Sequence, residues 1–161
     1  MARAHIEFFE KIRICNKNFR GEERRTSTGK LANKFGTRHF SVILPIEKAE
    51  AMAEEGWNIG FGEDSKGNEV GYLPIEARYN MYPPRVKLVD ETTGKKRELN
   101  EDSIDELDRM AIRYADVVVS PRPWTKDDGS TAIKAYLKSA QFYPDFDPLE
   151  AIWASEEYEE E

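Results

Sequence analysis

Cysteine, histidine and long apolar runs are all scarce in this sequence, and each scarcity excludes a class of protein. Cys15 is the single cysteine, so neither an intramolecular disulfide nor a cysteine-based metal site can form. The two histidines, His5 and His39, are too few and too isolated to suggest a metal centre. Apolar runs extend over only a few residues, and the N-terminus lacks the apolar stretch of a secretory signal. We therefore expect a protein of a reducing cytoplasm, with no membrane contact, metal or cofactor.

Signatures of catalysis are also missing. Thr28-Gly29-Lys30 resembles the end of a phosphate-binding loop, but Leu31 stands where that loop needs a hydroxyl group. Gly60-Phe61-Gly62 has no third glycine at the spacing of a nucleotide fingerprint. The acidic pairs Glu63-Asp64 and Asp127-Asp128 lie in turn-like segments, where carboxylates are common without any metal. No serine, cysteine or histidine stands in a pattern of nucleophile and base, so we predict a protein that is not an enzyme.

Charge is distributed unevenly along the 161 residues, whose formal net charge is −7. Residues 1–40 carry ten Lys/Arg against four Asp/Glu, whereas residues 144–161 carry eight Asp/Glu and no Lys/Arg. Such sorting predicts a basic surface for a polyanion and a separate acidic segment. Acidic residues with isolated aromatics cannot pack a core. We therefore assign residues 1–143 to one domain and residues 144–161 to an acidic C-terminal tail.

Strand patterns dominate the predicted domain. Alternation or β-rich composition predicts strands at residues 11–14, 38–44, 57–61, 70–82, 85–89, 116–124 and 131–143, the last two joined as a hairpin. Pro74 predicts an edge or bulge within residues 70–82. Helical spacing after Pro45 and a capping box at residues 103–106 predict two short helices. About seven strands with two inserted helices indicate a mainly β domain, of which an OB-like Greek-key barrel is the natural architecture.

Residues 20–38 predict a long basic loop, since they hold six cations and no periodic apolar pattern. Proteins that bind single strands need cations for phosphates and exposed rings on which bases stack. The candidate cations are Lys11, Arg13, Lys17, Arg20, Arg24, Arg25, Lys30 and Arg38. The candidate stacking rings are Phe19, Tyr79 and Trp124. For Phe19 and Trp124 burial is an equal alternative, and we expect Phe8, Phe40, Trp57 and Tyr136 in the core.

Four segments suggest a known family: residues 18–21, 36–44, 54–59 and 132–139. Together with the acidic tail, they resemble phage-encoded single-stranded DNA-binding proteins, which combine an OB barrel with an acidic, often aromatic-bearing C-terminal tail. The resemblance spans nearly the whole chain. It implies non-catalytic, largely sequence-independent binding of single-stranded DNA during phage replication or recombination, in the cytoplasm of the host cell.

The tail predicts a second contact surface. Its residues Trp153, Glu159, Glu160 and Glu161 are candidates for binding replication or recombination proteins, and its carboxylates can compete with DNA for a basic groove. Alternatively, Ile152 and Trp153 pack back onto the barrel. A homo-oligomer is a further partner arrangement that the sequence leaves undecided. Two other functions also stay open: a phage interaction protein, such as a virion component or host-factor inhibitor, and a metal-dependent nuclease.

Overall fold

The computed structural model describes residues 5–80 and 83–145, apart from the side chain of Ala32. In this part of the chain the elements are β1 (Glu7–Ile12), β2 (Ile14–Asn18), β3 (Arg24–Arg25), β4 (Leu31–Asn33), β5 (Arg38–Pro45), α1 (Ile46–Glu54), β6 (Gly60–Glu63), β7 (Glu69–Ala77), β8 (Arg85–Val89), β9 (Lys96–Leu99), the 3-10 helix η1 (Ile104–Arg109), β10 (Ile112–Thr125) and β11 (Thr131–Pro144). The predicted mainly β class is confirmed. No helix among these residues is long and apolar enough to cross a membrane.

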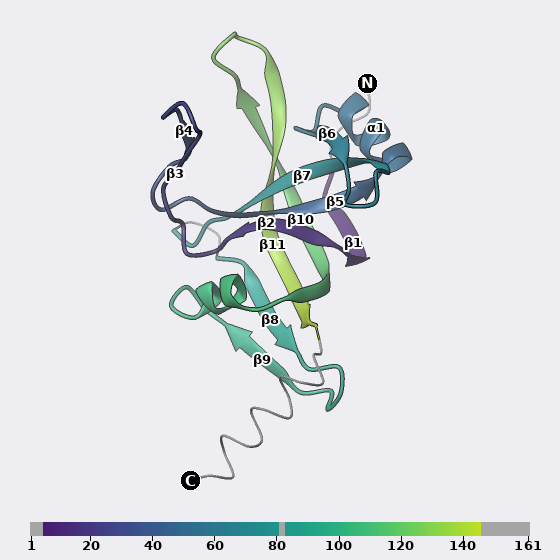
Figure 1. Ribbon diagram of the computed structural model, residues 1–161, viewed down its shortest axis with the longest axis vertical. Helices are drawn as coiled ribbons and strands as arrows, with labels where there is room; N and C mark the ends of the chain where they lie inside the picture. The colour runs from purple at the N-terminus through teal and green to yellow at the C-terminus, as the bar shows by residue number, and fades with distance from the viewer. Residues whose placement is uncertain (1–4, 81–82, 146–161) are drawn as a thin grey trace.

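The main sheet curls on itself because its two end strands are consecutive in the chain. The strand order is β1-β10-β11-β7-β5-β2, and a single residue, Arg13, separates β1 from β2. Lys11, two residues before Arg13, has a φ of 50°, which bends the chain. The backbone N–H of Ile43 on β5 donates to the Arg13 carbonyl across 2.9 Å. This curled sheet is consistent with the predicted OB-like fold (Figure 1).

Two β-hairpins project from the curled sheet (Figure 1). One is the upper end of β10 and β11, which pair antiparallel along almost their full length. Only Ala135 and Tyr136 of β11 pair with β7, so the strands nearer the turn extend beyond the sheet. The other is the separate two-stranded β3–β4 hairpin, inserted between β2 and β5. The segment predicted as a long basic loop is therefore a hairpin.

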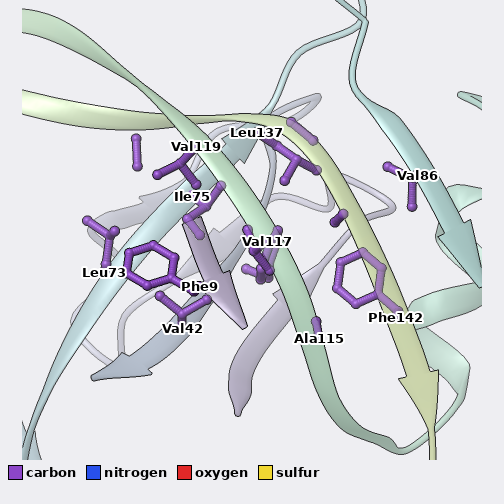
Figure 2. Packing of buried hydrophobic residues seen from close by; sticks show 14 of the residues in the cluster. Phe9, Val42, Leu73, Ile75, Val86, Ala115, Val117, Val119, Leu137 and Phe142 are labelled. Carbon is purple, nitrogen blue, oxygen red and sulfur yellow. The ribbon is translucent and has the colours of Figure 1, made fainter. Parts of the chain in front are cut away.

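Alternate residues of the strands form the core, because successive side chains point to opposite faces. Figure 2 shows this packing, with Val117 and Val119 of β10 among the labelled side chains. Three fully buried rings lie together, since Phe19 stacks on Phe40 with centroids 5.2 Å apart and meets the edge of Phe142 at 5.5 Å. Phe40 and Trp57 are buried as predicted. Phe8 is 59% exposed, so its predicted burial is wrong.

Helix α1 packs closely on β7. A Cβ on Gly71 would lie only 2.2 Å from the Cβ of Ala49, so glycine is required for this approach. Gly56 follows the helix with a φ of 103°, in the left-handed region that favours glycine after a helix end. Pro74 is accommodated because β6 pairs with β7 only as far as Tyr72, whereas β11 pairs with it from Ile75 onward. Pro74 therefore lies where one flank of β7 has no partner strand, as an edge position requires.

The predicted capping box does not form. The Ser103 side chain makes no capping hydrogen bond to the helix; its hydroxyl instead accepts the Asn100 N–H at 2.9 Å. Residues 104–109 form a 3-10 helix, after which Met110 is already extended and Tyr114 belongs to β10. The helix is therefore limited to this short 3-10 segment, which buries Ile104 and Leu107, and the long strand β10 begins at residue 112.

Candidate nucleic-acid interface

The β3–β4 hairpin is anchored at its root by a polar network. The Asn18 side chain donates to the Glu22 carbonyl and accepts the Glu22 N–H, both at 2.9 Å. Asn33 donates to the same Glu22 carbonyl at 2.7 Å. Gly36 donates to the Gly21 carbonyl at 2.8 Å, and Gly21 has a φ of 75°. These bonds fix the direction in which the hairpin leaves the sheet.

The hairpin carries exposed cations. Arg24, Arg25 and Lys30 are all exposed, so the structure brings these three predicted residues together. Arg25 is held by the Gly29 carbonyl at 2.9 Å and by the Glu23 carboxylate at 3.1 Å. Arg24 lies near the sheet: the pKa of His39 is lowered first by burial and then by the positive field of Arg24. The cations thus extend from the hairpin to the outer surface of β5.

A row of side chains crosses the outer surface of four strands. His39 pairs with Glu76, Glu76 with Tyr136, and Tyr136 with Ser120, so all four point to the same side of the sheet. The neighbours of Tyr136 in β11, Ala135 and Leu137, are buried, which places the row on the face away from the core. The Tyr136 ring therefore lies at the centre of this outer face, where it was expected in the core.

Cations surround the rings of this face. The guanidinium carbons of Arg78 and Arg122 lie 4.9 Å and 5.6 Å from the centroid of the Tyr136 ring. The Lys134 amine lies 4.6 Å from the centroid of the Trp124 ring, and Trp124 is 36% exposed. Such contacts are the typical cation–π arrangement. We call this set the hairpin face: Glu76, Arg78, Arg122, Trp124, Lys134 and Tyr136.

Glu76 organises the cations of the hairpin face. One of its carboxylate oxygens accepts from Arg78 at 3.0 Å, and the other lies 3.6 Å from the Lys134 amine. The carboxylate thereby holds two cations beside the Tyr136 ring. Lys126 adds another cation 6.0 Å from the Trp124 ring. Because cations outnumber the one carboxylate, the face can neutralise phosphates while its rings receive bases.

A polar cavity continues the hairpin face toward the root of the β3–β4 hairpin. It has a volume of about 480 Å³, and its lining includes Lys34, Phe35, Arg38, Arg78 and Tyr79. Arg78 belongs to both the cavity and the hairpin face. Phe35 is 81% exposed, the highest value among the exposed large hydrophobic residues of the described chain. A ring this open is available for stacking.

Two predicted contact residues have structural roles instead. Phe19 is fully buried against Phe40, so its prediction as a stacking platform is wrong. The Lys17 amine donates to the Leu107 carbonyl at 2.7 Å and also to the Met110 carbonyl, and burial lowers its pKa. It is therefore committed to the end of η1, and its prediction as a phosphate ligand is wrong.

The remaining predicted residues are scattered or partly engaged. Arg38 is half-buried and donates to the Phe19 carbonyl at 2.7 Å. The Arg38 guanidinium carbon lies 5.8 Å from the centroid of the Tyr79 ring. Burial raises the pKa of Tyr79 to about 12. Lys11 contacts the Tyr114 and Tyr143 rings at the lower end of β10–β11. Arg13 lies at the β1–β2 bend. The structure thus does not gather these four around the hairpin face as a single set.

Among the remaining predicted contacts, Arg20 pairs with carboxylates, Trp124 is exposed, and the tail contacts lie outside the described residues. Arg20 is exposed but lies 3.2 Å from the Glu22 carboxylate and 4.0 Å from that of Asp105. Trp124 is exposed on the β10–β11 hairpin, so it stays a stacking candidate. Trp153, Glu159, Glu160 and Glu161 lie outside the described residues, as do Ile152 and nearly all of the predicted tail.

Of the hairpin-face residues, the site predicted from the sequence contains only Trp124. The signal was present in β11, where Lys134, Tyr136 and Lys138 alternate with small or aliphatic residues. That alternation places the polar set opposite the core. Tyr136 was assigned by residue type, because aromatics dominate cores, rather than by its position in this pattern.

Carboxylates that could have held a metal have other partners. Asp64 accepts the backbone N–H groups of Lys66 and Asn68, both at 2.9 Å, and these bonds help to lower its pKa. Asp128 accepts the N–H and hydroxyl of Ser130, which lowers its pKa in the same way. In residues 5–80 and 83–145 no group of three or more His, Cys, Asp or Glu is placed to hold a metal ion. These carboxylates therefore cap turns.

Comparisons with known proteins identify the family and a similar fold. The family model described as "putative phage ssDNA-binding domain" matches residues 3–160. The fold is similar to that of the single-stranded DNA-binding protein from bacteriophage Enc34, a C-terminal truncation, with a TM-score of 0.50 and 12% identity over 89% of this chain and 88% of that one. The single-stranded DNA-binding protein gp2.5 of bacteriophage T7 matches with a TM-score of 0.43 and 14% identity over 94% and 93% of the two chains. No curated protein sequence matches. Since the family model spans nearly the whole sequence, this chain belongs to the phage single-stranded DNA-binding domain family.

Proposed function

We infer that this protein binds single-stranded DNA on the hairpin face, without catalysis and with little sequence preference. The observation that carries the proposal is the pairing of rings with cations. The guanidinium groups of Arg78 and Arg122 contact the Tyr136 ring, and the Lys134 amine contacts the Trp124 ring. Bases stack on the rings while the cations neutralise phosphates. The family supports a role in phage DNA replication or recombination in the host cytoplasm.

A single strand fits this face better than a duplex. Stacking needs the flat faces of bases, which a duplex hides between its neighbouring base pairs. The face presents rings and cations rather than a set of donors and acceptors matched to base edges, so it can hold any base. The β3–β4 hairpin adds Arg24, Arg25 and Lys30 beside the row that begins at His39. We propose that the strand passes from this hairpin across Tyr136 to Trp124.

We further propose that residues 144–161 act as an acidic segment whose role is separate from that of the DNA-binding domain. They hold eight carboxylates and no cation, so they attract the same basic surface that binds DNA. Replication or recombination proteins with basic surfaces are their candidate partners, with Trp153 and the three terminal glutamates as contacts. Proteins bound in this way would be recruited to DNA that the domain covers.

The stacking role is tested with Tyr136→Leu and Trp124→Ala. Each should weaken binding of an oligothymidylate by about 1–3 kcal/mol, or roughly five- to 150-fold in Kd, with little change in melting temperature. Phe61→Ala is the matched control, because Phe61 is also exposed at 55% but pairs with Gly71, which faces α1. Fluorescence anisotropy and thermal unfolding are measured on the same samples.

Lys134→Ala tests the electrostatic part. It should flatten the dependence of log Kd on log salt by about 0.7, the value expected for one lost phosphate contact of a single strand. If the two ring variants bind the oligonucleotide like the control, the strand does not lie on the hairpin face. If the wild-type protein binds duplex and single strand equally, the stacking mechanism is wrong.

A further inference from the structure

A second surface with the same chemistry lies lower on the outer side of β10 and β11. It is a shallow groove of about 350 Å³ whose lining includes Phe8, Arg85, Lys87, Asp116, Val118 and Lys138. Phe8 of β1 pairs in register with Val118 of β10 and is 59% exposed. An exposed phenylalanine beside several cations is not required by the core, since the ring points away from it.

The cations of the groove are unpaired within the described chain. Arg85, Lys87 and Lys138 make no ion pair, side-chain hydrogen bond or ring contact with another described residue. The one carboxylate in the lining, Asp116, is engaged elsewhere: it accepts the Lys11 N–H at 2.8 Å and the Tyr143 hydroxyl at 2.6 Å. Cations without intramolecular counter-ions form a site for an external polyanion.

The groove is continuous with the hairpin face along the strands. Val118, Ser120 and Arg122 are alternate residues of β10 and therefore point to the same side of that strand. The distance from Val118 to Arg122 along the strand is about 14 Å, at roughly 3.4 Å per residue. On β11 the register shifts at this level, where Val118 pairs with Ser139 and Val119 with Leu137. Lys138 is the additional residue of this bulge and is exposed.

We propose that this groove is a second contact for the same single strand of DNA that the hairpin face binds. The strand continues past Tyr136 along the outer side of β10–β11, where its phosphates meet Arg85, Lys87 and Lys138 and a base stacks on Phe8. Arg85 and Lys87 are alternate residues of β8, about 7 Å apart, a spacing comparable with that of successive phosphates in an extended strand. The proposal rests on the proposed function and adds a second site to it.

Oligothymidylates of two lengths test the proposal. A probe of about 5 nucleotides can occupy the hairpin face alone, whereas one of about 16 nucleotides can reach the groove as well. The variant Arg85→Ala/Lys87→Ala/Lys138→Ala should bind the short probe like the wild type. For the long probe its salt slope should fall by about 2, since three phosphate contacts are lost. Phe8→Ala should weaken only the long probe, roughly five- to 150-fold.

A control variant separates the local effect from the loss of total charge. Lys66→Ala/Lys95→Ala/Lys96→Ala removes the same charge from exposed positions at the β6–β7 and β8–β9 turns, outside the groove lining. It should keep the wild-type slope for both probes. The same slope change in the control and in the groove variant would overturn the proposal.

Other outcomes distinguish failure of the groove from failure of the proposed function. Failure of the wild type to bind either probe would refute the proposed function itself. If the groove variant binds both probes normally, the groove is not a DNA contact, and the hairpin face remains the proposed site. The same conclusion follows if the groove variant weakens both probes to the same extent. A synthetic peptide of residues 144–161 serves as a second probe. If the groove variant loses only this peptide and keeps the long oligonucleotide, the groove is an acidic-peptide site and not a DNA contact.

Discussion

Phe19 distinguishes a core role from a DNA-binding role most sharply, because its neighbourhood in the sequence suggests the opposite of its position in the structure. It follows Lys17 and precedes Arg20, yet its ring is fully buried between Phe40 and Phe142. Its N–H and that of Arg20 both donate to the Asp108 carboxylate at 2.8 Å, which fixes this segment on η1. The ring therefore stabilises the root of the β3–β4 hairpin from inside.

Replacing Phe19 with alanine should cost about 3–5 kcal/mol of folding free energy, the usual cost of removing a buried phenylalanine. The two ring contacts place the expected value in the upper part of this range, since each aromatic pair adds about 0.5–1.5 kcal/mol. For a domain of this size the melting temperature should fall by about 6–20 °C. Urea unfolding measures the free energy, and anisotropy at a temperature where the variant is folded measures DNA binding.

Phe35→Ala is the matched comparison, because Phe35 is 81% exposed and belongs to the cavity beside the hairpin face. It should change the free energy of unfolding by no more than about 0.5 kcal/mol, as surface substitutions do. The reasoning is refuted if Phe19→Ala keeps its melting temperature and loses DNA affinity, because the ring would then be a contact and not part of the core.

Two further perturbations test the electrostatics. Burial and Arg24 lower the pKa of His39 below its ordinary value near 6.5, so the unfolded state binds more protons and stability should decrease as pH falls through about 6.5 toward the folded-state pKa. His39→Gln should flatten that part of the curve of melting temperature against pH; an identical curve would exclude His39 as its cause. Deleting residues 148–161 removes six carboxylates and should tighten oligonucleotide binding, most at low salt. A lower melting temperature with unaltered affinity would instead show that the tail stabilises the domain.

The strands could be predicted from the sequence wherever one face is buried and the other is open. Residues 116–124 and 131–143 were assigned correctly because β10 and β11 alternate along most of their length. The second predicted helix exists as η1, but its predicted capping box does not form, because Asn100 and Ser103 bond to each other and not to the helix. Short polar side chains can close a turn or cap a helix with the same hydrogen bonds, so sequence alone does not separate the two.

The site was only partly predictable, since a cation's sequence neighbours do not reveal its partner. Arg24 and Lys30 are correctly expected on an exposed segment because residues 20–38 hold no periodic apolar pattern. Lys17 looks the same in sequence, but its amine is satisfied by carbonyls of η1, some 90 residues away. Tyr136 needs the register of β7 and β11 to show that Glu76 and its cations lie beside it. Such long-range pairing is not encoded in local periodicity.

The segment 18–21 illustrates how binding and folding are coupled in this protein. It was singled out as a mark of DNA-binding proteins, yet Asn18 and Gly21 form the hairpin root and Phe19 fills the core below it. The exposed cations of the β3–β4 hairpin depend on this root for their position. A substitution in the segment can therefore lower DNA affinity without removing any contact to DNA. For this reason an affinity loss identifies a contact residue only when the melting temperature of the same variant is unchanged.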